Sequence, residues 1–159
     1  VAHALAGDGV VLAHAASMEG IIAVGKMAGR AVPALTRARI PNATYCEPQI
    51  GSIGLTEQQA RQAGYAVKTG KFPFAANSKA NIVGRHEGFV KVVAEEKNGE
   101  ILGVHIIGPL ATEILAGPVA VLQMEATVDD MMFTVHSHPT AWEALGEAYA
   151  AVRGLAINI

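Results

Sequence analysis

The sequence predicts an α+β fold, in which an antiparallel sheet has helices packed on it. Apolar residues make up 51% of the 159 residues, enough for the core of one domain of ordinary size. Two apolar runs, at 89–94 and 101–107, flank an Asn-Gly pair and indicate a β-hairpin. Helix-start signals between and after the strand-like runs place several helices beside that sheet.

Residues 1–40 differ in character from the rest of the chain. They contain four basic and two acidic residues, whereas residues 41–159 contain eight basic and twelve acidic ones. In the first segment we expect an Ala-rich helix over about 17–31, which Pro33 ends. Residues 1–40 are therefore interpreted as the tail of one unit, and residues 41–159 as a domain of their own.

The second segment begins with strand signals and a short helix. Two short apolar runs lie within residues 45–55 and are broken by Pro48. Thr56 and Gln59 have the spacing of a capping box, which predicts a helix that Gly64 closes.

The remainder of the second segment contains the other strands and helices. An alternating pattern over 67–74 predicts a strand. Asn98-Gly99 tolerates the positive φ values of a type I′ turn, which makes the hairpin of 89–94 and 101–107 the strongest local signal. Helices are expected at 111–125, at 129–132 after Thr127, and from Thr140 to about Val152.

Charge and cysteine content exclude several functional classes. The formal net charge is −2 with no block of like charges, so nothing indicates a nucleic-acid or membrane-surface partner. The apolar stretch 101–122 contains His105, Glu113 and two prolines, so we interpret it as a strand and a helix, not a membrane span. One cysteine, Cys46, excludes an intrachain disulfide and a multi-cysteine zinc site. A single thiol fits a reducing cytoplasm, and we expect this one to be half-buried.

The segment TVHSHPTAWEALGEA, residues 134–148, holds the residues best suited to catalysis. His138 precedes the last predicted helix, and Glu143 lies in its first turn. A carboxylate beside an imidazole fixes its tautomer and raises its basicity, as a general base requires. Two alternatives remain open: Glu143 completes a capping box with Thr140, or His138 is an ordinary surface or core histidine. His136 with His138 is a weak metal pattern, so no metal site is expected.

An acidic stretch surrounds this segment. Between residues 98 and 152 the chain has seven carboxylates and no Lys or Arg. One interpretation is a solvated acidic face. The other is a field that favours the protonated forms of His105, His136 and His138.

These residues carry a family resemblance. HSHPTAWEA, at 136–144, resembles the His-x-His-Pro-Thr-x-x-Glu signature of the dihydrolipoyl dehydrogenases, a branch of the FAD-dependent pyridine nucleotide–disulfide oxidoreductases. Five more segments resemble the dimerisation domain of that family, in the same order: YCEPQIGSIGLTE at 45–57, FPFAANSKA at 72–80, GFVKVVAE at 88–95, ILGVHIIGPLATEI at 101–114 and EATVDDM at 125–131. Together they are spread over most of residues 41–159.

The resemblance implies a division of the chain. Residues 41–159 would be the C-terminal dimerisation domain, and residues 1–40 the tail of the FAD-binding domain. The FAD-contacting positions that it implies are Asp8, Leu12, Ala13 and His14. Without the resemblance, Gly7-Asp8 indicates only a turn.

The resemblance also implies a reaction. His138 would deprotonate dihydrolipoamide, because the thiolate is the species that attacks a disulfide, and Glu143 would stabilise the imidazolium. Electrons would pass to FAD and on to NAD in a homodimer whose active site is shared between the subunits. The partner would be the lipoyl-bearing acyltransferase of a 2-oxoacid dehydrogenase complex, in the cytoplasm. The His138–Pro139 peptide bond would be cis.

Two other functions remain open. Glutathione reductases share His-Pro-Thr and the Glu, so a related disulfide reductase that uses NADP is one. A dimerisation or docking module without turnover is the other, since the chain has neither the family's Cys-x4-Cys disulfide nor its Gly-rich dinucleotide fingerprint. We therefore expect the chain alone to be inactive.

Overall fold

The computed structural model describes residues 12–158, and the chain divides into two compact units, 1–40 and 41–159. Gly7 and Asp8, where we expected a turn, lie outside the described residues.

The first unit contains helix α2 (Ala13–Met27) and the 3-10 turn η1 (Arg37–Arg39). Helix α2 begins and ends four residues earlier than the predicted range of 17–31. The reason for the earlier end lies at Gly29, which has a φ of +69°. A glycine in this left-handed conformation closes a helix, so α2 ends ahead of Pro33 and not because of it.

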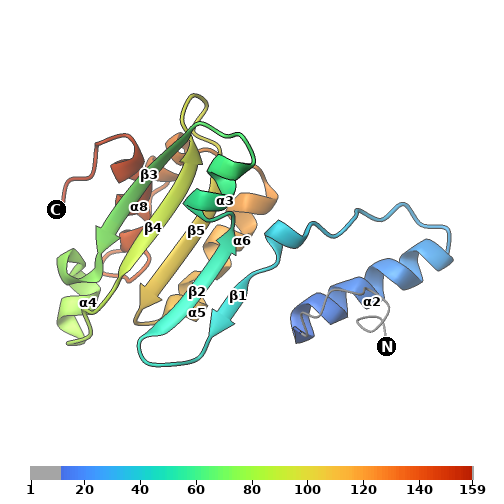
Figure 1. Cartoon of the computed structure of the whole chain (residues 1–159). Helices are drawn as coiled ribbons and strands as arrows, with labels where there is room; N and C mark the ends of the chain where they lie inside the picture. The colour runs from blue at the N-terminus through green and yellow to red at the C-terminus, as the bar shows by residue number, and fades with distance from the viewer. Residues whose placement is uncertain (1–11, 159) are drawn as a thin grey trace. The chain divides into compact units, whose positions relative to one another are not determined.

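The second unit is built on a five-stranded sheet with the order β1-β2-β5-β4-β3. Every neighbouring pair of strands is antiparallel, and the chain forms the sheet shown in Figure 1. The strands are β1 (Asn42–Thr44), β2 (Gln49–Gly54), β3 (Val67–Pro73), β4 (Phe89–Glu95) and β5 (Ile101–Gly108).

Helices cover this sheet mainly on one face (Figure 1). They are α3 (Glu57–Gln62), η2 (Phe74–Ala76), α4 (Ser78–Ile82), α5 (Ala111–Ile114), α6 (Ala116–Gln123), α7 (Val128–Met132) and α8 (Glu143–Val152). Helices α5, α6 and α8 pack on the sheet, and α7 packs on α8. The predicted α+β class is therefore confirmed.

The core follows from the alternation of side chains along the strands. Val92 of β4 lies in the large cluster under α8, whereas its neighbour Val93 lies in a small cluster with Ala60 of α3. Successive strand residues point to opposite faces, so one strand serves both clusters. Tyr149 of α8 is the largest fully buried side chain.

The predicted capping box at the start of α3 is confirmed. The Gln59 N–H donates to Thr56 Oγ1 over 3.2 Å, and the Thr56 N–H donates to Gln59 Oε1 over 2.9 Å. Gly64, with a φ of +90°, follows the helix as expected. Thr127 also caps its helix, in a reciprocal arrangement with Asp130.

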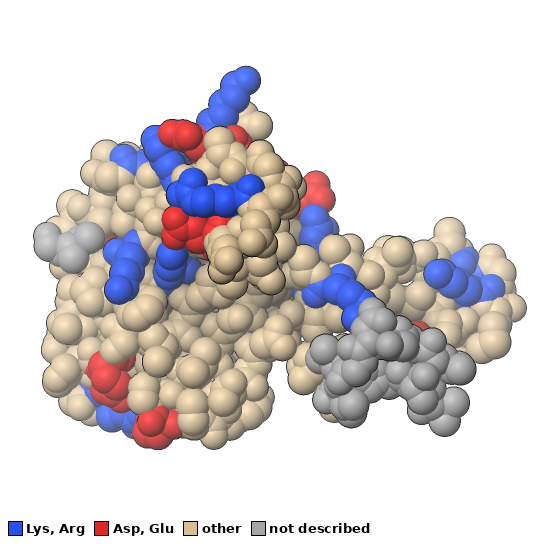
Figure 2. Space-filling view, in the orientation of Figure 1, with Lys and Arg blue, Asp and Glu red and all other residues tan. Residues whose placement is uncertain are grey.

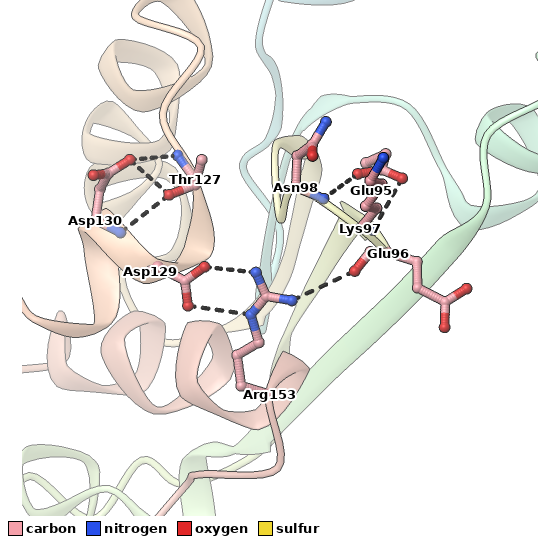
Figure 3. A network of polar contacts seen from close by, with 8 residues as sticks. All are labelled: Glu95, Glu96, Lys97, Asn98, Thr127, Asp129, Asp130 and Arg153. Atoms are coloured by element: carbon pink, nitrogen blue, oxygen red, sulfur yellow. Dashed lines mark hydrogen bonds and ion pairs between the residues drawn. The ribbon is translucent and has the colours of Figure 1, made fainter.

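The hairpin of β4 and β5 is present, but its turn differs from the prediction. Gly99 has a φ of +74°, whereas Asn98 is not among the described non-glycine residues with positive φ, so the turn is not type I′. The Glu95 carboxylate accepts hydrogen bonds from the N–H groups of Lys97 and Asn98 (Figure 3). These two bonds stabilise a longer loop over 96–99.

The single helix predicted over 111–125 is divided into α5 and α6 at Leu115. Pro118 explains the division, because it has no N–H to donate to the carbonyl of Ile114. The ladder resumes where the Val119 N–H donates to the Leu115 carbonyl over 3.1 Å.

The surface departs from expectation at the cysteine. Cys46 is exposed rather than half-buried, and its Sγ lies 3.0 Å from the carbonyl oxygen of Pro48. It lies after β1, in the connection to β2. Basic and acidic side chains lie next to one another on the face shown in Figure 2. Among the described residues, no helix is both long and apolar enough to cross a bilayer.

Candidate functional site

The segment between α7 and α8 places His138 against Glu143. His138 Nδ1 lies 2.9 Å from Glu143 Oε1, so the ring N–H donates to the carboxylate. The His138–Pro139 peptide bond is cis, as the family resemblance implied. The His138 side chain is 67% exposed and that of Glu143 is 30% exposed. The ring is therefore held at one nitrogen and open to solvent on the rest of its surface.

Glu143 contributes both of its carboxylate oxygens. While Oε1 binds His138, Oε2 accepts a hydrogen bond from the Thr140 N–H over 2.7 Å. Thr140 Oγ1 donates instead to the Ser137 carbonyl over 2.8 Å, and no side chain caps α8. The two alternatives at Glu143 are thus not exclusive: one oxygen contacts the imidazole and the other makes half of a capping box.

The protonation state of Glu143 suits this arrangement. Burial raises the pKa of Glu143, but the hydrogen bonds from the Thr140 N–H and from His138 outweigh it and hold that pKa below its ordinary value. An ionised carboxylate at Nδ1 fixes the Nδ1–H tautomer and leaves Nε2 of His138 as the atom that accepts a proton.

Asn77 binds the segment between α7 and α8 through a buried side chain, and the sequence analysis did not identify it. Its side chain is 3% exposed, its Nδ2 donates to the Thr140 carbonyl over 3.1 Å, and its Oδ1 accepts from the Ala80 N–H over 2.9 Å. The position before Ser78 could have indicated a helix cap. No local pattern could have indicated the bond to Thr140, which is 63 residues away.

A small polar hollow of about 200 Å³ lies beside the pair. It is lined by His138, Glu143, Glu147, Asn77, Ser78, Phe72, Ala76 and Asn158. Glu147 accepts hydrogen bonds from the N–H groups of Ile157 and Asn158, which brings the C-terminal segment back to α8. Glu147 and Asn158 were not predicted as part of the site, because no motif marks them.

Two carboxylates of the acidic stretch have partners other than histidine, and His105 has a different environment. Asp129 binds Arg153, and Asp130 caps α7. His105 lies on β5, where its Nε2 is 3.1 Å from the Leu55 carbonyl oxygen. Burial lowers the pKa of His105 despite that hydrogen bond, and the charge of Lys91 lowers it further. The expectation that His105 favours its protonated form is therefore wrong.

The remaining predicted positions lie in the first unit. Leu12 precedes α2, and Ala13 and His14 form its first turn. Asp8 lies outside the described residues. Within residues 12–158, no three His, Cys, Asp or Glu side chains gather closely enough to hold a metal ion.

Comparison with known proteins adds a family to this geometry. The family model for the pyridine nucleotide-disulphide oxidoreductase dimerisation domain matches residues 40–149. The chain is 45% identical over 150 residues to the dihydrolipoyl dehydrogenase of Bacillus subtilis, and 40% identical over 149 residues to that of Rhizobium etli. These alignments cover 94% and 93% of this chain but only 32% and 31% of the relatives. The chain thus spans about a third of the length of the relatives that it matches.

Solved structures share the fold. LpdA from Mycobacterium tuberculosis matches with a TM-score of 0.83 at 23% identity, over 89% of this chain and 31% of that protein. The flavoprotein disulfide reductase RclA from Escherichia coli matches with a TM-score of 0.81 at 20% identity, over 89% of this chain and 33% of RclA. At these identities the match concerns the fold alone.

Proposed function

This chain belongs to the pyridine nucleotide-disulphide oxidoreductases through their dimerisation domain, and on that premise we propose that it is part of a dihydrolipoyl dehydrogenase. In this proposal, residues 41–159 supply the dimer interface and the acid–base pair His138–Glu143. The names of relatives at 40–45% identity support dihydrolipoamide as the substrate. The contact between His138 and Glu143 supports acid–base catalysis.

The proposed role of His138 is to take the proton of a substrate thiol. A thiol is a weak nucleophile until it is deprotonated, because the thiolate is the reactive form. His138 Nε2 accepts that proton, while the Glu143 carboxylate at Nδ1 stabilises the resulting imidazolium. The 67% exposure of the His138 side chain leaves it accessible to a substrate that arrives from outside this chain.

FAD and NAD belong to the same proposal, with residues 1–40 as the tail of the FAD-binding domain. FAD, when bound, would supply the redox chemistry that links oxidation of the dithiol to reduction of NAD. The residues that would hold FAD are Asp8, Leu12, Ala13 and His14. The described part of this set fits a backbone that passes close to a flat ring, since Ala13 is small and exposed.

We further propose that the protein is a homodimer through the second unit. Val135 is 94% exposed and Phe133 is 78% exposed, both in the segment that leads to His138. Large apolar side chains at this exposure indicate a surface that another protein covers. Sedimentation at micromolar concentration should give a dimer, and Val135→Asp should shift it toward monomer. A wild-type chain that is only monomeric would count against an interface made by this unit alone.

The remaining parts of the proposal concern the whole protein. Its partner is the lipoyl-bearing acyltransferase of a 2-oxoacid dehydrogenase complex, it works in the cytoplasm, and this chain alone does not turn over. The alternatives are a glutathione reductase-like enzyme that uses NADP and a dimerisation or docking module without catalysis.

A chimera tests the proposal against these alternatives. In this "assembled enzyme", the present chain replaces the matching third of the Bacillus subtilis relative. We expect bound FAD and reduction of NAD by dihydrolipoamide, and no activity from the chain alone. Preference for glutathione disulfide over the lipoyl substrate would favour the first alternative. An assembled enzyme that binds FAD and dimerises but does not react would favour the second.

A further inference from the structure

The loop from His136 to Glu143 is closed by two contacts rather than one. The hydrogen bond between His138 and Glu143 is the first. The second joins the residues beside them: the rings of His136 and Trp142 stack with their centroids 3.8 Å apart and their planes inclined by 32°. His136 is two residues before His138, and Trp142 immediately precedes Glu143.

The Trp142 ring packs against Gly117 of α6, which has no side chain. A Cβ atom on Gly117 of α6 would lie 2.5 Å from Trp142 Cζ2 and 2.9 Å from its Nε1, so only glycine leaves room for the indole there. Trp142 also packs against the main core cluster. The stack is therefore anchored on a helix that is separate from the loop it closes.

The imidazole of His136 contributes its flat face and not its hydrogen bonding. Its Nε2 is buried and has no hydrogen-bond partner. A buried polar atom without a partner costs free energy, so hydrogen bonding at this atom is not what stabilises the ring here. The stack on Trp142 is the contact that its ring makes.

We propose that His136 and Trp142 are positioning residues, whose stack on Gly117 closes the base of the 136–143 loop and thereby holds His138 against Glu143. This inference rests on the proposed function of His138 and Glu143. Without the stack, residues 136–138 would lose a fixed distance to the start of α8. A single hydrogen bond to a ring that is largely exposed would then have to compete with water.

The tautomer of His138 provides the test, because it reports the contact with Glu143 independently of activity. The ¹⁵N shifts of the imidazole, measured on this chain at alkaline pH, show which ring nitrogen carries the proton. We expect the Nδ1–H form in the wild type. His136→Leu and Trp142→Leu should lose that preference, whereas His136→Phe, which keeps a ring, should retain it.

A pair of glycine substitutions supplies a matched control. Gly117→Ala should displace the indole and weaken the Nδ1–H preference, although alanine favours a helix more than glycine does. Gly146→Ala on α8 has no heavy atom within 4 Å of the added Cβ and should leave the tautomer unchanged. Near-wild-type dichroism would show that each variant is folded.

The outcomes separate this inference from the proposed function. If both leucine variants are folded and keep the Nδ1–H form, the stack does not position His138 and the inference is overturned, while the acid–base proposal stands. If the wild type itself shows no preference for Nδ1–H, the contact between His138 and Glu143 fails, and both proposals fail with it.

Discussion

Near each end of helix α8 a carboxylate contacts a nitrogen-containing side chain. The two contacts differ in whether that side chain can release and regain a proton. Near the N-terminus, His138 binds Glu143 through one ring nitrogen at 2.9 Å. Just after the C-terminus, Arg153 donates Nε and Nη2 to the two oxygens of Asp129 over 3.1 and 2.5 Å (Figure 3). Arg153 also donates Nη1 to the Glu96 carbonyl over 3.4 Å, so α7, α8 and the hairpin loop meet at one guanidinium.

The difference lies in what the nitrogen group beside each carboxylate can do. A guanidinium stays charged at every accessible pH, and its fork matches a carboxylate, so the Arg153 contact persists wherever Asp129 is ionised and serves the structure. An imidazole gains and loses a proton near neutral pH, so the His138 contact can take part in proton transfer. Exposure agrees with this division, since the Arg153 side chain is 23% exposed and that of His138 is 67% exposed.

The largest expected effect comes from removing the titrating group at the N-terminal end. In the assembled enzyme, His138→Gln keeps some hydrogen bonding but removes the base, so the rate with dihydrolipoamide should fall about 10²–10⁴-fold. FAD content and dimerisation should not change. His136→Gln is the control and should have the smaller effect on rate. A greater loss in the His136 variant would mean that the base has been assigned to the wrong histidine.

Glu143→Gln should reduce the rate less, by about 10²-fold or below. The amide oxygen still accepts a hydrogen bond from His138, but it no longer offers a negative charge to the imidazolium. Steady-state kinetics of the assembled enzyme measure the effect. A loss as great as that of His138→Gln would show that the charge of Glu143, and not its geometry, dominates.

The sequence predicted features that a few neighbouring residues decide. The capping box of Thr56 and the hairpin around Gly99 are of this kind. The same holds for the division at Pro118 in retrospect, because its missing N–H is visible in the sequence. A continuous helix over 111–125 would include Pro118 and would leave the Ile114 carbonyl without its usual N–H donor.

Features that depend on distant residues were not predictable in this way. Asn77 reaches Thr140 across 63 residues, and the stack of Trp142 on Gly117 depends on how α6 meets α8. The burial that lowers the pKa of His105 likewise comes from the assembled sheet. For the candidate site, the motif indicated the two central residues, and the fold supplied their supports.

The C-terminal end of α8 should show the opposite pattern to the N-terminal end. Asp129→Asn removes the charge that Arg153 binds, so thermal unfolding should occur at a lower temperature while the rate of the assembled enzyme stays unchanged. Glu113→Gln, on the exposed side of α5, is the matched control and should leave the unfolding temperature as it is. A loss of rate without a loss of stability in the Asp129 variant would contradict the division of roles along α8.

The smallest effect concerns the pH dependence of stability, and it separates His105 from the carboxylates Glu143 of α8 and Asp129 of α7. The pKa values of Glu143 and Asp129 lie below their ordinary values in the folded chain, so their contribution is present above about pH 4–4.5 and is lost as the pH falls through the folded pKa. The pKa of His105 is also lowered, but for a histidine this means that protonation favours the unfolded chain. The free energy of unfolding should therefore begin to fall already near pH 6.5, the pKa in the unfolded chain, and continue to fall until the folded pKa is passed. His105→Gln keeps a donor for the Leu55 carbonyl and cannot titrate. The free energy of unfolding, measured with denaturant at several pH values between 5 and 8, should therefore change less steeply with pH in this variant than in the wild type. All other histidines are common to both proteins, so equal slopes would show that His105 is not the group responsible.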